Sequence, residues 1–372
     1  MVTSLHEVIA RLGDSGLRLL KAIPRGPDQL NLEIQDSSRG VLTGQWHRDP
    51  ARSGAVAADV EATCGAGAAW TLDHSGIVLL EPGADPRLPA LRTVLRRPGA
   101  QLVAHRLERR AVVREAHGDY TKVMPPELAG RVASALFRVR IPSIAVPRLT
   151  DLDVDLGTVT TAPLPGRTFH AELGDHSISD EDVALVAKSV GSAVRELHQL
   201  PPSAALPLHD VEAELRVCRR WLTAASDHGL IPEDRWRGGL ERAGALLERD
   251  SAQVVTVHRD LHEKQVMILR GQPVGLLDLD LLGPGDPALD VGNLLAHFEL
   301  RALHARSRPD RPWVARAAFL EGYAPGPRLM TRAAGYVLST RLRLAAVYAF
   351  RDAPADLIED LLNPAKDRGT VP

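Results

Sequence analysis

Val254–Asp290 reads VVTVHRDLHEKQVMILRGQPVGLLDLDLLGPGDPALD and is the most informative segment of the chain. Two β-type runs flank a polar loop that extends from His258 to Gln265, and a third apolar run ends on Asp278. Glycine and proline separate the last two runs, which is typical of a β-hairpin. The pattern therefore predicts that four polar side chains meet at one rim: Asp260, Gln265, Asp278 and Asp280.

Carboxylates and an amide oxygen at one rim suit magnesium-dependent phosphoryl transfer. In that chemistry one carboxylate accepts the proton of the attacking hydroxyl, and hard oxygen ligands hold the metal on the nucleotide phosphates. A short H-R-D segment alone is weak evidence, because it occurs by chance in many chains. The order and spacing of several such segments carry more weight.

The residues H-R-D-L-H-E-K-Q, followed by L-D-L-D, resemble the catalytic loop and metal-binding strand of the aminoglycoside phosphotransferase and choline kinase-like superfamily. That superfamily shares the protein-kinase-like fold, and its loop typically reads H-x-D-x-x-x-x-N. Gln265 replaces the asparagine here, as in maltokinase-like sugar kinases. The segment 283–290, G-P-G-D-P-A-L-D, is similar to the G-D-P-x-x-D that opens the next helix in these kinases.

The resemblance implies a role for each matching residue. Asp260 would be the catalytic base, Gln265 and Asp278 would bind Mg²⁺, and His258 and Asp290 would support the loop. An N-cap role for Asp290 is the alternative. The implied activity is ATP-dependent phosphorylation of a hydroxyl on a small molecule.

The implied architecture is α+β, a two-lobed protein-kinase-like fold with a β-rich small lobe and a mainly helical large lobe. We expect an N-terminal cap over residues 1–95, the small nucleotide lobe over 96–162, and the large lobe with the acceptor pocket over 163–372. Residues 1–95 contain no motif that we can assign. Their patterns predict a first helix with apolar positions from Leu5 to Leu12, and a loop plus a weak helix over 53–68. They also predict strands at Gln29–Ile34, Gly40–Trp46, Ala69–Leu72 and Gly76–Leu80.

Three β-type runs from Gln101 to Met124 predict an antiparallel meander, and Lys122 lies on the third. The resemblance implies that Lys122 meets the nucleotide phosphates. Two departures stand out. The turn Leu107–Arg109 has no glycine and cannot be a phosphate-wrapping Gly-rich loop. The only nearby glutamate is Glu127, in the first turn of the next helix, so either it orients Lys122 from an unusual place or the lysine has no carboxylate partner.

The run Gly157–Ala162 and the following P-L-P-G-R predict a strand that leaves into a tight connection. By resemblance this is the hinge between lobes, where backbone groups of Thr161 and Ala162 would bind adenine. A plain surface turn explains the prolines equally well. From Ser179, a good N-cap, the patterns become helical. After the helix that begins at Ser179, the expected helices are His209–Ala225, Arg235–Glu248, Ala288–His304, Trp313–Tyr323 and Leu329–Phe350.

Composition narrows the class of protein. The chain has 372 residues, 44% hydrophobic and 25% charged, the balance of a soluble globular protein. A net charge of -2 argues against a broad nucleic-acid surface. No run approaches the length needed to span a membrane, the N-terminus lacks a signal-like apolar stretch, and two distant cysteines indicate no disulfide framework. We therefore expect a cytoplasmic protein.

The expected partner is a small hydroxylated acceptor. The charges after Asp290 are mixed, and the last long helix carries arginines, which favours a neutral sugar or related metabolite over a polycationic aminoglycoside. Two alternatives remain open. One is a nucleotide-binding scaffold without turnover, suggested by the missing glycines and by Gln265. The other is a metal hydrolase that uses His258, Asp260 and His262, although such sites usually need further ligands.

Overall fold

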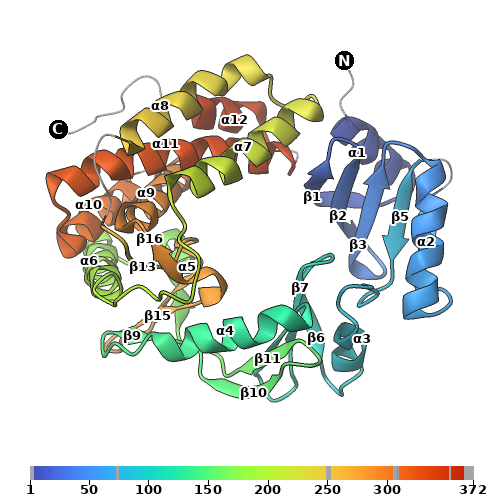
Figure 1. Ribbon diagram of the computed structural model, residues 1–372, viewed down its shortest axis with the longest axis horizontal. Coiled ribbons are helices and arrows are strands. Elements are labelled where there is room, and N and C mark those ends of the chain that lie inside the picture. The colour runs from blue at the N-terminus through green and yellow to red at the C-terminus, as the bar shows by residue number, and fades with distance from the viewer. Residues whose placement is uncertain are drawn as a thin grey trace.

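The computed structural model describes residues 4–72, 75–248, 253–304, 308, 310–351 and 353–363. The chain begins with α1 (Ser4–Asp14) and a five-stranded antiparallel sheet in the order β1-β2-β3-β5-β4. The strands are β1 (Arg18–Gly26), β2 (Gln29–Asp36), β3 (Gly40–His47), β4 (Ala69–Leu72) and β5 (Ile77–Leu80). Helix α2 (Ala51–Cys64) covers one face of this sheet (Figure 1).

Both faces of the N-terminal sheet are buried, which explains the fully apolar β5. Ile77 and Leu79 point into the large core that α1 joins, whereas Val78 and Leu80 pack toward α2. The predicted first helix and β2 to β5 are confirmed, but β1 was missed. Only one of its nine residues is buried, so no alternation marks it. The weak helix expected over 53–68 is instead a regular helix from Ala51 to Cys64.

The second sheet has the order β10-β11-β8-β7-β6. Its strands are β6 (Gln101–Arg106), β7 (Arg110–Arg114), β8 (Tyr120–Val123), β10 (Leu149–Asp153) and β11 (Thr158–Thr161). The predicted meander of β6, β7 and β8 is confirmed by their antiparallel registers. Helix α3 (Ala90–Leu95) precedes this sheet and α4 (Pro126–Arg138) packs against β10 and β11.

The motif-bearing segment forms short strands, and its predicted hairpin is confirmed. Strands β14 (Val266–Ile268) and β15 (Val274–Leu276) form the hairpin. β13 (Val255–Val257) pairs instead with β16 (Gly283–Gly285). A Cβ atom on Gly285 would lie 2.6 Å from the Val257 side chain, so glycine permits this close pairing. The loop of residues 258–265 therefore connects two separate small sheets. The second sheet also contains β12 (Arg167–Thr168) and β9 (Ile144–Ala145), one on each side of the hairpin.

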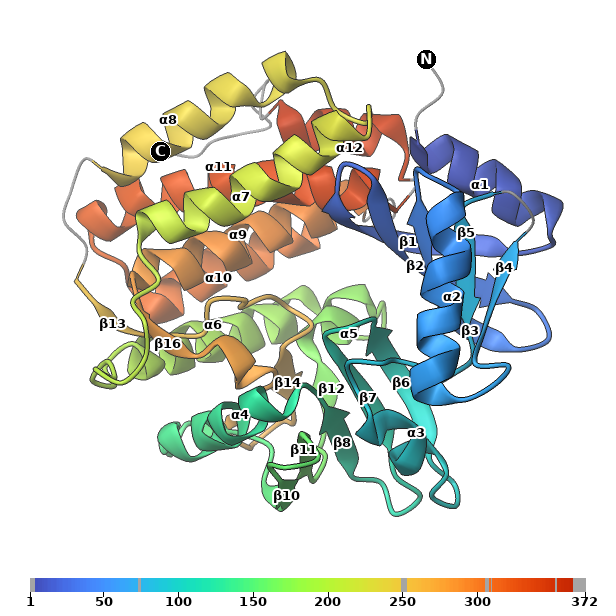
Figure 2. The ribbon, with the colours of Figure 1, turned by 45° about the vertical axis from the view of Figure 1, so that its right-hand side comes forward.

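The rest of the chain is mainly helical. Ser179 caps α6 as predicted, since its Oγ accepts a hydrogen bond from the backbone N–H of Asp182 at 3.0 Å. Helices α7, α9 and α11 pack side by side (Figure 2). The α-helices are α5 (Phe169–Gly174), α6 (Asp180–Leu197), α7 (Val211–Asp227), α8 (Arg237–Leu247), α9 (Pro287–His304), α10 (Arg311–Tyr323), α11 (Pro327–Ala349) and α12 (Ala355–Leu362). Two 3₁₀ turns accompany them, Glu233–Arg235 and Leu279–Leu281. Among the described residues, no helix combines the length and apolarity that crossing a bilayer requires.

The N-terminal sheet contacts both other parts of the molecule. Asn31 Nδ2 donates to the carbonyl oxygen of Leu107 in the β6–β7 turn at 3.3 Å. On the other side, the N–H of Ala22 donates to the carbonyl oxygen of Phe350 at 2.8 Å, just after α11. In Figure 1 the sheet thus closes a ring between the end of α7 and the tip of the β6–β7 hairpin.

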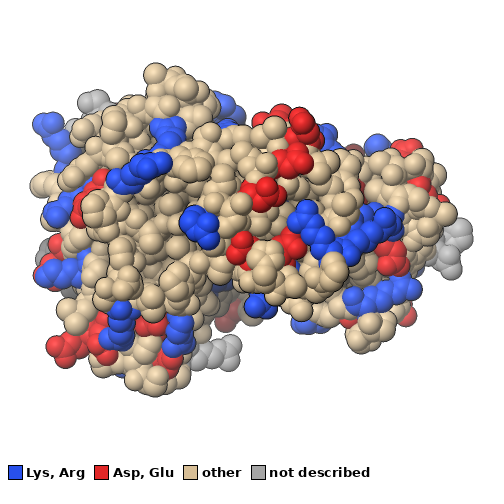
Figure 3. Space-filling view, turned by 90° about the horizontal axis from the view of Figure 1, so that it is seen from below, with Lys and Arg blue, Asp and Glu red and all other residues tan. Residues whose placement is uncertain are grey.

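This arrangement is the predicted two-lobed α+β fold, in which an N-terminal unit precedes the β-rich lobe and the mainly helical lobe. The limits 1–95, 96–162 and 163–372 stay a prediction. Basic and acidic side chains are interspersed on the face seen in Figure 3, so this face presents no broad surface of one sign.

Candidate active site

A buried network anchors the loop that carries Asp260. Asp290, fully buried in the first turn of α9, accepts hydrogen bonds from the backbone N–H groups of His258 (2.7 Å) and Arg259 (2.8 Å). His198 Nε2 lies 3.0 Å from the same carboxylate. Burial by itself raises the pKa of Asp290, but the hydrogen bond with His198 and the charges nearby hold that pKa below its usual range. Asp290 therefore supports the loop, as expected from the resemblance, and is not the helix cap.

His258 uses both ring nitrogens inside the protein. Its Nε2 donates to the carbonyl oxygen of Leu277 at 2.8 Å, and its Nδ1 accepts from the N–H of Asp260 at 3.4 Å. The first contact ties the loop to the strand that ends before Asp278. Because neither nitrogen is free, His258 is not a metal ligand in this arrangement, which removes one member of the hydrolase set.

Two residues of the site have left-handed backbone conformations. Arg259 has a φ of 73° and Asp278 a φ of 54°. For residues other than glycine this costs on the order of 1 kcal/mol each, and such strain is concentrated at functional sites. Arg259 directly precedes the predicted base Asp260, and Asp278 is itself a predicted metal ligand.

Asp260 opens into a cavity of about 360 Å³. No hydrogen bond or ion pair with another described residue engages its carboxylate, so that group is available to a ligand. The cavity is rich in charged side chains from both lobes. The basic ones are Arg106, Arg109, Arg110, Arg131, Arg259 and Arg343, and the acidic ones are Glu214, Asp260, Asp278 and Asp280.

Asp278 and Asp280 form a carboxylate pair with two cations. Lys122 Nζ lies 3.0 Å from Asp278 Oδ1 and 2.5 Å from Asp280 Oδ1. Arg110 donates to Asp278 through both terminal nitrogens, at 2.9 and 2.8 Å, and to Asp280 at 2.7 Å. Burial alone raises the pKa of Asp278, but the charge of Lys122 and the hydrogen bonds of Arg110 hold it well below its usual range. The carboxylate of Asp278 is therefore ionised at neutral pH.

Glu127 is not the carboxylate that pairs with Lys122 in this structure. It is exposed in the first turn of α4, while Asp278 and Asp280 occupy the ammonium group. The lysine thus has carboxylate partners, but they come from the segment after β15. The predicted role of Glu127 in nucleotide binding is therefore not supported by a contact with Lys122.

Gln265 lies at the start of the hairpin strand beside Asp278. Its carbonyl oxygen accepts from the N–H of Leu277 at 2.8 Å, and its side-chain Nε2 lies 3.4 Å from His262 Nε2. The amide nitrogen thus faces the histidine ring. The amide oxygen of Gln265 and the carboxylates of Asp278 and Asp280 are hard oxygen donors of the kind that bind Mg²⁺. The residues present fit such an ion.

The predicted hinge differs in one detail from the expectation. Thr161 ends β11, paired with Tyr120 and Leu149. The N–H of Ala162 donates to the carbonyl oxygen of Arg148 at 2.9 Å, so it is not free for adenine. Two backbone groups of this connection have no hydrogen-bond partner among the described residues: the carbonyl oxygen of Ala162 and the N–H of Leu164. Prolines on both sides of Leu164 carry no N–H.

Behind the loop, Glu263 is almost completely buried within a cationic cluster. Its carboxylate lies 3.2 Å from His170 and 3.3 Å from both His297 and Arg301. Burial, followed by the neighbouring His297, lowers the pKa of His262 to about 4. His262, Glu263 and His297 come close enough to share a metal ion, but the guanidinium of Arg301 already neutralises Glu263. We interpret the cluster as structural support for the loop.

Sequence reasoning missed three arginines around Asp260. Arg110 had no motif to mark it, although it starts the second strand of the meander. Arg343, on α11, donates to Asn293 Oδ1 at 2.8 Å, and Arg259 Nη2 lies 2.9 Å from His209 Nδ1. The Nε atoms of Arg343 and Arg259 are buried without a hydrogen-bond partner. Arg259 lies inside the H-R-D segment and was detectable there, whereas the sequence marked Arg343 only as one arginine of the last long helix, and the fold brings it to the cavity of Asp260.

Known proteins resemble this chain over much of its length. The profile of the phosphotransferase enzyme family (APH) matches residues 89–336, which span the second sheet, the site and most of the helices. The N-terminal sheet precedes that match. No curated protein matches the chain.

Solved structures similar to this chain include aminoglycoside phosphotransferases. The GDP complex of aminoglycoside 2'-phosphotransferase-IIIa is 12% identical with a TM-score of 0.52, over 73% of this chain and 94% of that chain. ADP-bound aminoglycoside phosphotransferase APH(2'')-Ib is 13% identical with a TM-score of 0.50 over the same shares. Aminoglycoside phosphotransferase APH(3'')-Id from Streptomyces rimosus is 24% identical with a TM-score of 0.48, over 68% and 98%. At these identities the likeness shows the fold alone.

Proposed function

Because this chain belongs to the phosphotransferase enzyme family, we propose that it is an ATP-dependent kinase of a small hydroxylated molecule. The acceptor would be a sugar, an aminoglycoside or a related metabolite, and the γ-phosphoryl group would pass to one of its hydroxyls. One observation carries the proposal. The unpartnered carboxylate of Asp260 shares a cavity with the carboxylate pair Asp278 and Asp280, to which Lys122 is bound.

Asp260 is the proposed catalytic base. A carboxylate without a competing partner can accept a hydrogen bond from an acceptor hydroxyl and take its proton as the phosphoryl group transfers. Asp290 and His258 fix the loop directly before it, so the carboxylate loses little freedom when the acceptor binds. These two are positioning residues.

The proposed metal ligands are Gln265 and Asp278, with Asp280 as a further oxygen donor. When bound, Mg²⁺ would neutralise phosphate charge and align the transferred group. Lys122 and Arg110 already bind the carboxylate pair from the second sheet, and they would offset the remaining charge of the phosphates. The cations bound to the carboxylate pair therefore come from the second sheet, and the carboxylates from the segment after β15.

For the adenine we propose a backbone site at the connection after β11. The carbonyl oxygen of Ala162 can accept from the exocyclic amine, and the N–H of Leu164 can donate to a ring nitrogen. Thr161 positions this connection through its strand pairing. Ala162 thereby keeps the role expected from the sequence through its carbonyl oxygen rather than its N–H.

The test is a steady-state assay of ATP consumption with Mg²⁺ over a panel of sugars, aminoglycosides and amino alcohols. Phosphorylated product that depends on one acceptor, on Mg²⁺ and on Asp260 would support the kinase. Tight ATP binding with no turnover on any acceptor would favour the scaffold, which the glycine-free turn before Arg110 still motivates.

A further inference from the structure

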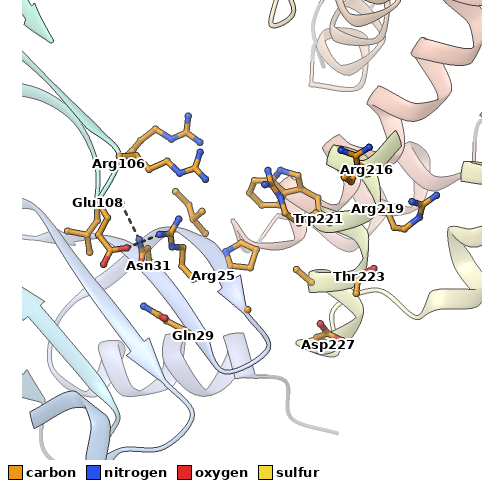
Figure 4. A pocket seen from close by; sticks show the side chains of 17 residues that line it. Arg25, Gln29, Asn31, Arg106, Glu108, Arg216, Arg219, Trp221, Thr223 and Asp227 are labelled. Atoms are coloured by element: carbon orange, nitrogen blue, oxygen red, sulfur yellow. Dashed lines mark hydrogen bonds and ion pairs between the residues drawn. The ribbon is translucent and has the colours of Figure 1, made fainter. Parts of the chain in front are cut away.

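A second, larger cavity adjoins the one that holds Asp260. It has a volume of about 830 Å³, within the range of small-molecule sites. Its walls come from β1 and β2, from the β6–β7 turn and from α7. Figure 4 shows Arg106 on one side of the opening and Trp221, Arg216 and Arg219 on the other. Arg106 and Arg109 line both cavities, which are therefore neighbours.

The lining of the larger cavity is strongly basic. Glu108 is already engaged by Arg25 at 2.9 Å and by Gln45 at 3.2 Å, and Asp227 is the second lining carboxylate. Against these two stand six arginines: Arg25, Arg106, Arg109, Arg216, Arg219 and Arg220. Within the described parts of the chain, the side chains of four of the six make no ion pair or hydrogen bond: Arg106, Arg109, Arg219 and Arg220.

These arginines repel one another. Burial lowers the pKa of Arg109, and the charges of Arg25 and Arg220 lower it further. Arg25 lies on β1 and Arg220 on α7, so like charges face each other across the cavity. Burial, followed by the charges of Arg110 and Arg109, likewise lowers the pKa of Arg106. An anion would relieve this repulsion and satisfy unused guanidinium donors.

The basic lining continues to the reactive carboxylate. Arg259 and Arg343 each hold a buried Nε without a partner in the cavity that Asp260 lines. A ligand that extends from the α7 arginines into the neighbouring cavity would present a hydroxyl to Asp260. A polycation would meet six guanidinium groups in the same place.

We propose, on the basis of the proposed function, that the larger cavity binds an anionic group of the acceptor, so that the substrate is a hydroxylated small molecule bearing a phosphate or a carboxylate. Bidentate guanidinium donors recognise both groups. The walls formed by β1 and β2 precede the segment that matches the family. The N-terminal sheet thus contributes an acceptor subsite in addition to its packing role.

The experiment compares the Arg219→Gln/Arg220→Gln double variant with Arg242→Gln. Arg219 and Arg220 are exposed and line the larger cavity but not the cavity of Asp260, and glutamine keeps helix propensity. Arg242 is an exposed arginine on α8 that lines neither cavity. Each full-length protein is saturated with ADP and Mg²⁺ and titrated calorimetrically with inorganic phosphate, gluconate and glucose.

We expect one of the two anions to bind and glucose to bind much more weakly. The double variant should weaken anion binding about tenfold or more, as expected for the loss of two charged partners, while Arg242→Gln and the ADP affinity stay unchanged. Binding of inorganic phosphate alone would indicate a phosphorylated acceptor, and binding of gluconate alone a carboxylated one.

Absence of binding by both anions, or equal binding by the double variant and the wild type, would overturn the inference. Turnover of only neutral or cationic acceptors would also overturn it and leave the kinase intact. Failure of ADP to bind would contradict the proposed function instead. The arginine site would then be judged by titrating the same anions into nucleotide-free protein.

Discussion

Arg110 holds Asp278 through two parallel hydrogen bonds of 2.9 and 2.8 Å, each from a different terminal nitrogen to a different carboxylate oxygen. Asp278 is also one of the proposed metal ligands. An arginine that donates to both oxygens uses lone pairs that a bound metal would need. Arg110 and Mg²⁺ are therefore expected to compete for one carboxylate.

Arg110→Gln should lower the Mg²⁺ concentration required for half-maximal activity. Removing a charge-assisted pair of about 1.5 kcal/mol corresponds to roughly tenfold in that concentration. The measurement is the initial rate against Mg²⁺ at saturating ATP. Arg114→Gln, an exposed arginine on the same strand, is the matched control and should leave the curve unchanged. A higher Mg²⁺ requirement in Arg110→Gln would show that Arg110 assists metal binding rather than opposing it.

Asp260→Asn keeps the shape of the side chain but removes the proton acceptor. Turnover should fall by about 10² to 10⁴, the usual contribution of a general base. The affinity for ADP should barely change, because no cation of the site is bound to Asp260. Rates and ADP titrations on the same preparation separate the two effects. A variant that retains wild-type turnover would exclude Asp260 as the base.

Asp290→Asn should destabilise the protein in a pH-dependent way. Removing a buried charge that accepts from His258, Arg259 and His198 costs about 3 kcal/mol of unfolding free energy at pH 7. The folded pKa of Asp290 lies below its unfolded value. Its contribution is thus complete above the unfolded pKa of about 3.9 and is lost as the pH falls through the lower folded pKa.

Urea unfolding at pH 7 and at pH 3 measures this effect. The difference between wild type and Asp290→Asn should shrink at pH 3. Asp59→Asn, at an exposed position on α2, should change stability by less than about 0.5 kcal/mol at both pH values. An equal difference at the two pH values would mean that the ionised form of Asp290 does not stabilise the fold.

Local patterns predicted the parts of the site that are close in sequence. The loop of residues 258–265 and Asp278 are joined by short strands, and one backbone bond from Leu277 to Gln265 brings them together. The meander with Lys122 followed from strand periodicity in the same way. Contacts across the fold were not predictable. Lys122 meets Asp280 over a separation of 158 residues, and no spacing rule indicates such a pair.

The arginines of the last long helix show the same limit. In the sequence they form one row of arginines along a predicted helix, but in the structure they have different contacts. Arg341 is paired with Glu299 at 2.9 Å and also donates to a backbone carbonyl, whereas Arg343 lines the cavity of Asp260. The expectation of a neutral sugar relied on that row. Most of the basic residues that line the larger cavity, however, come from α7 and the β6–β7 turn.

Gln265 provides the most specific test of the proposed metal site. If its amide oxygen is a ligand, Gln265→Ala should raise the Mg²⁺ concentration for half-maximal rate about tenfold, the cost of roughly 1.4 kcal/mol for one lost ligand contact, and excess Mg²⁺ should partly restore activity. Gln265→Glu should shift the same curve toward lower Mg²⁺, because a carboxylate adds charge at similar length.

Gln272→Ala, an exposed glutamine in the turn of the same hairpin, controls for changes in hairpin stability. Gln265 also contacts His262 through its amide nitrogen at 3.4 Å, so a purely structural role is the competing explanation. A structural role predicts that Gln265→Ala lowers the melting temperature and the maximal rate without moving the Mg²⁺ curve. A ligand role moves the curve in opposite directions for alanine and glutamate. Identical Mg²⁺ dependence in both variants would remove Gln265 from the metal site and leave Asp278 and Asp280 as its protein ligands.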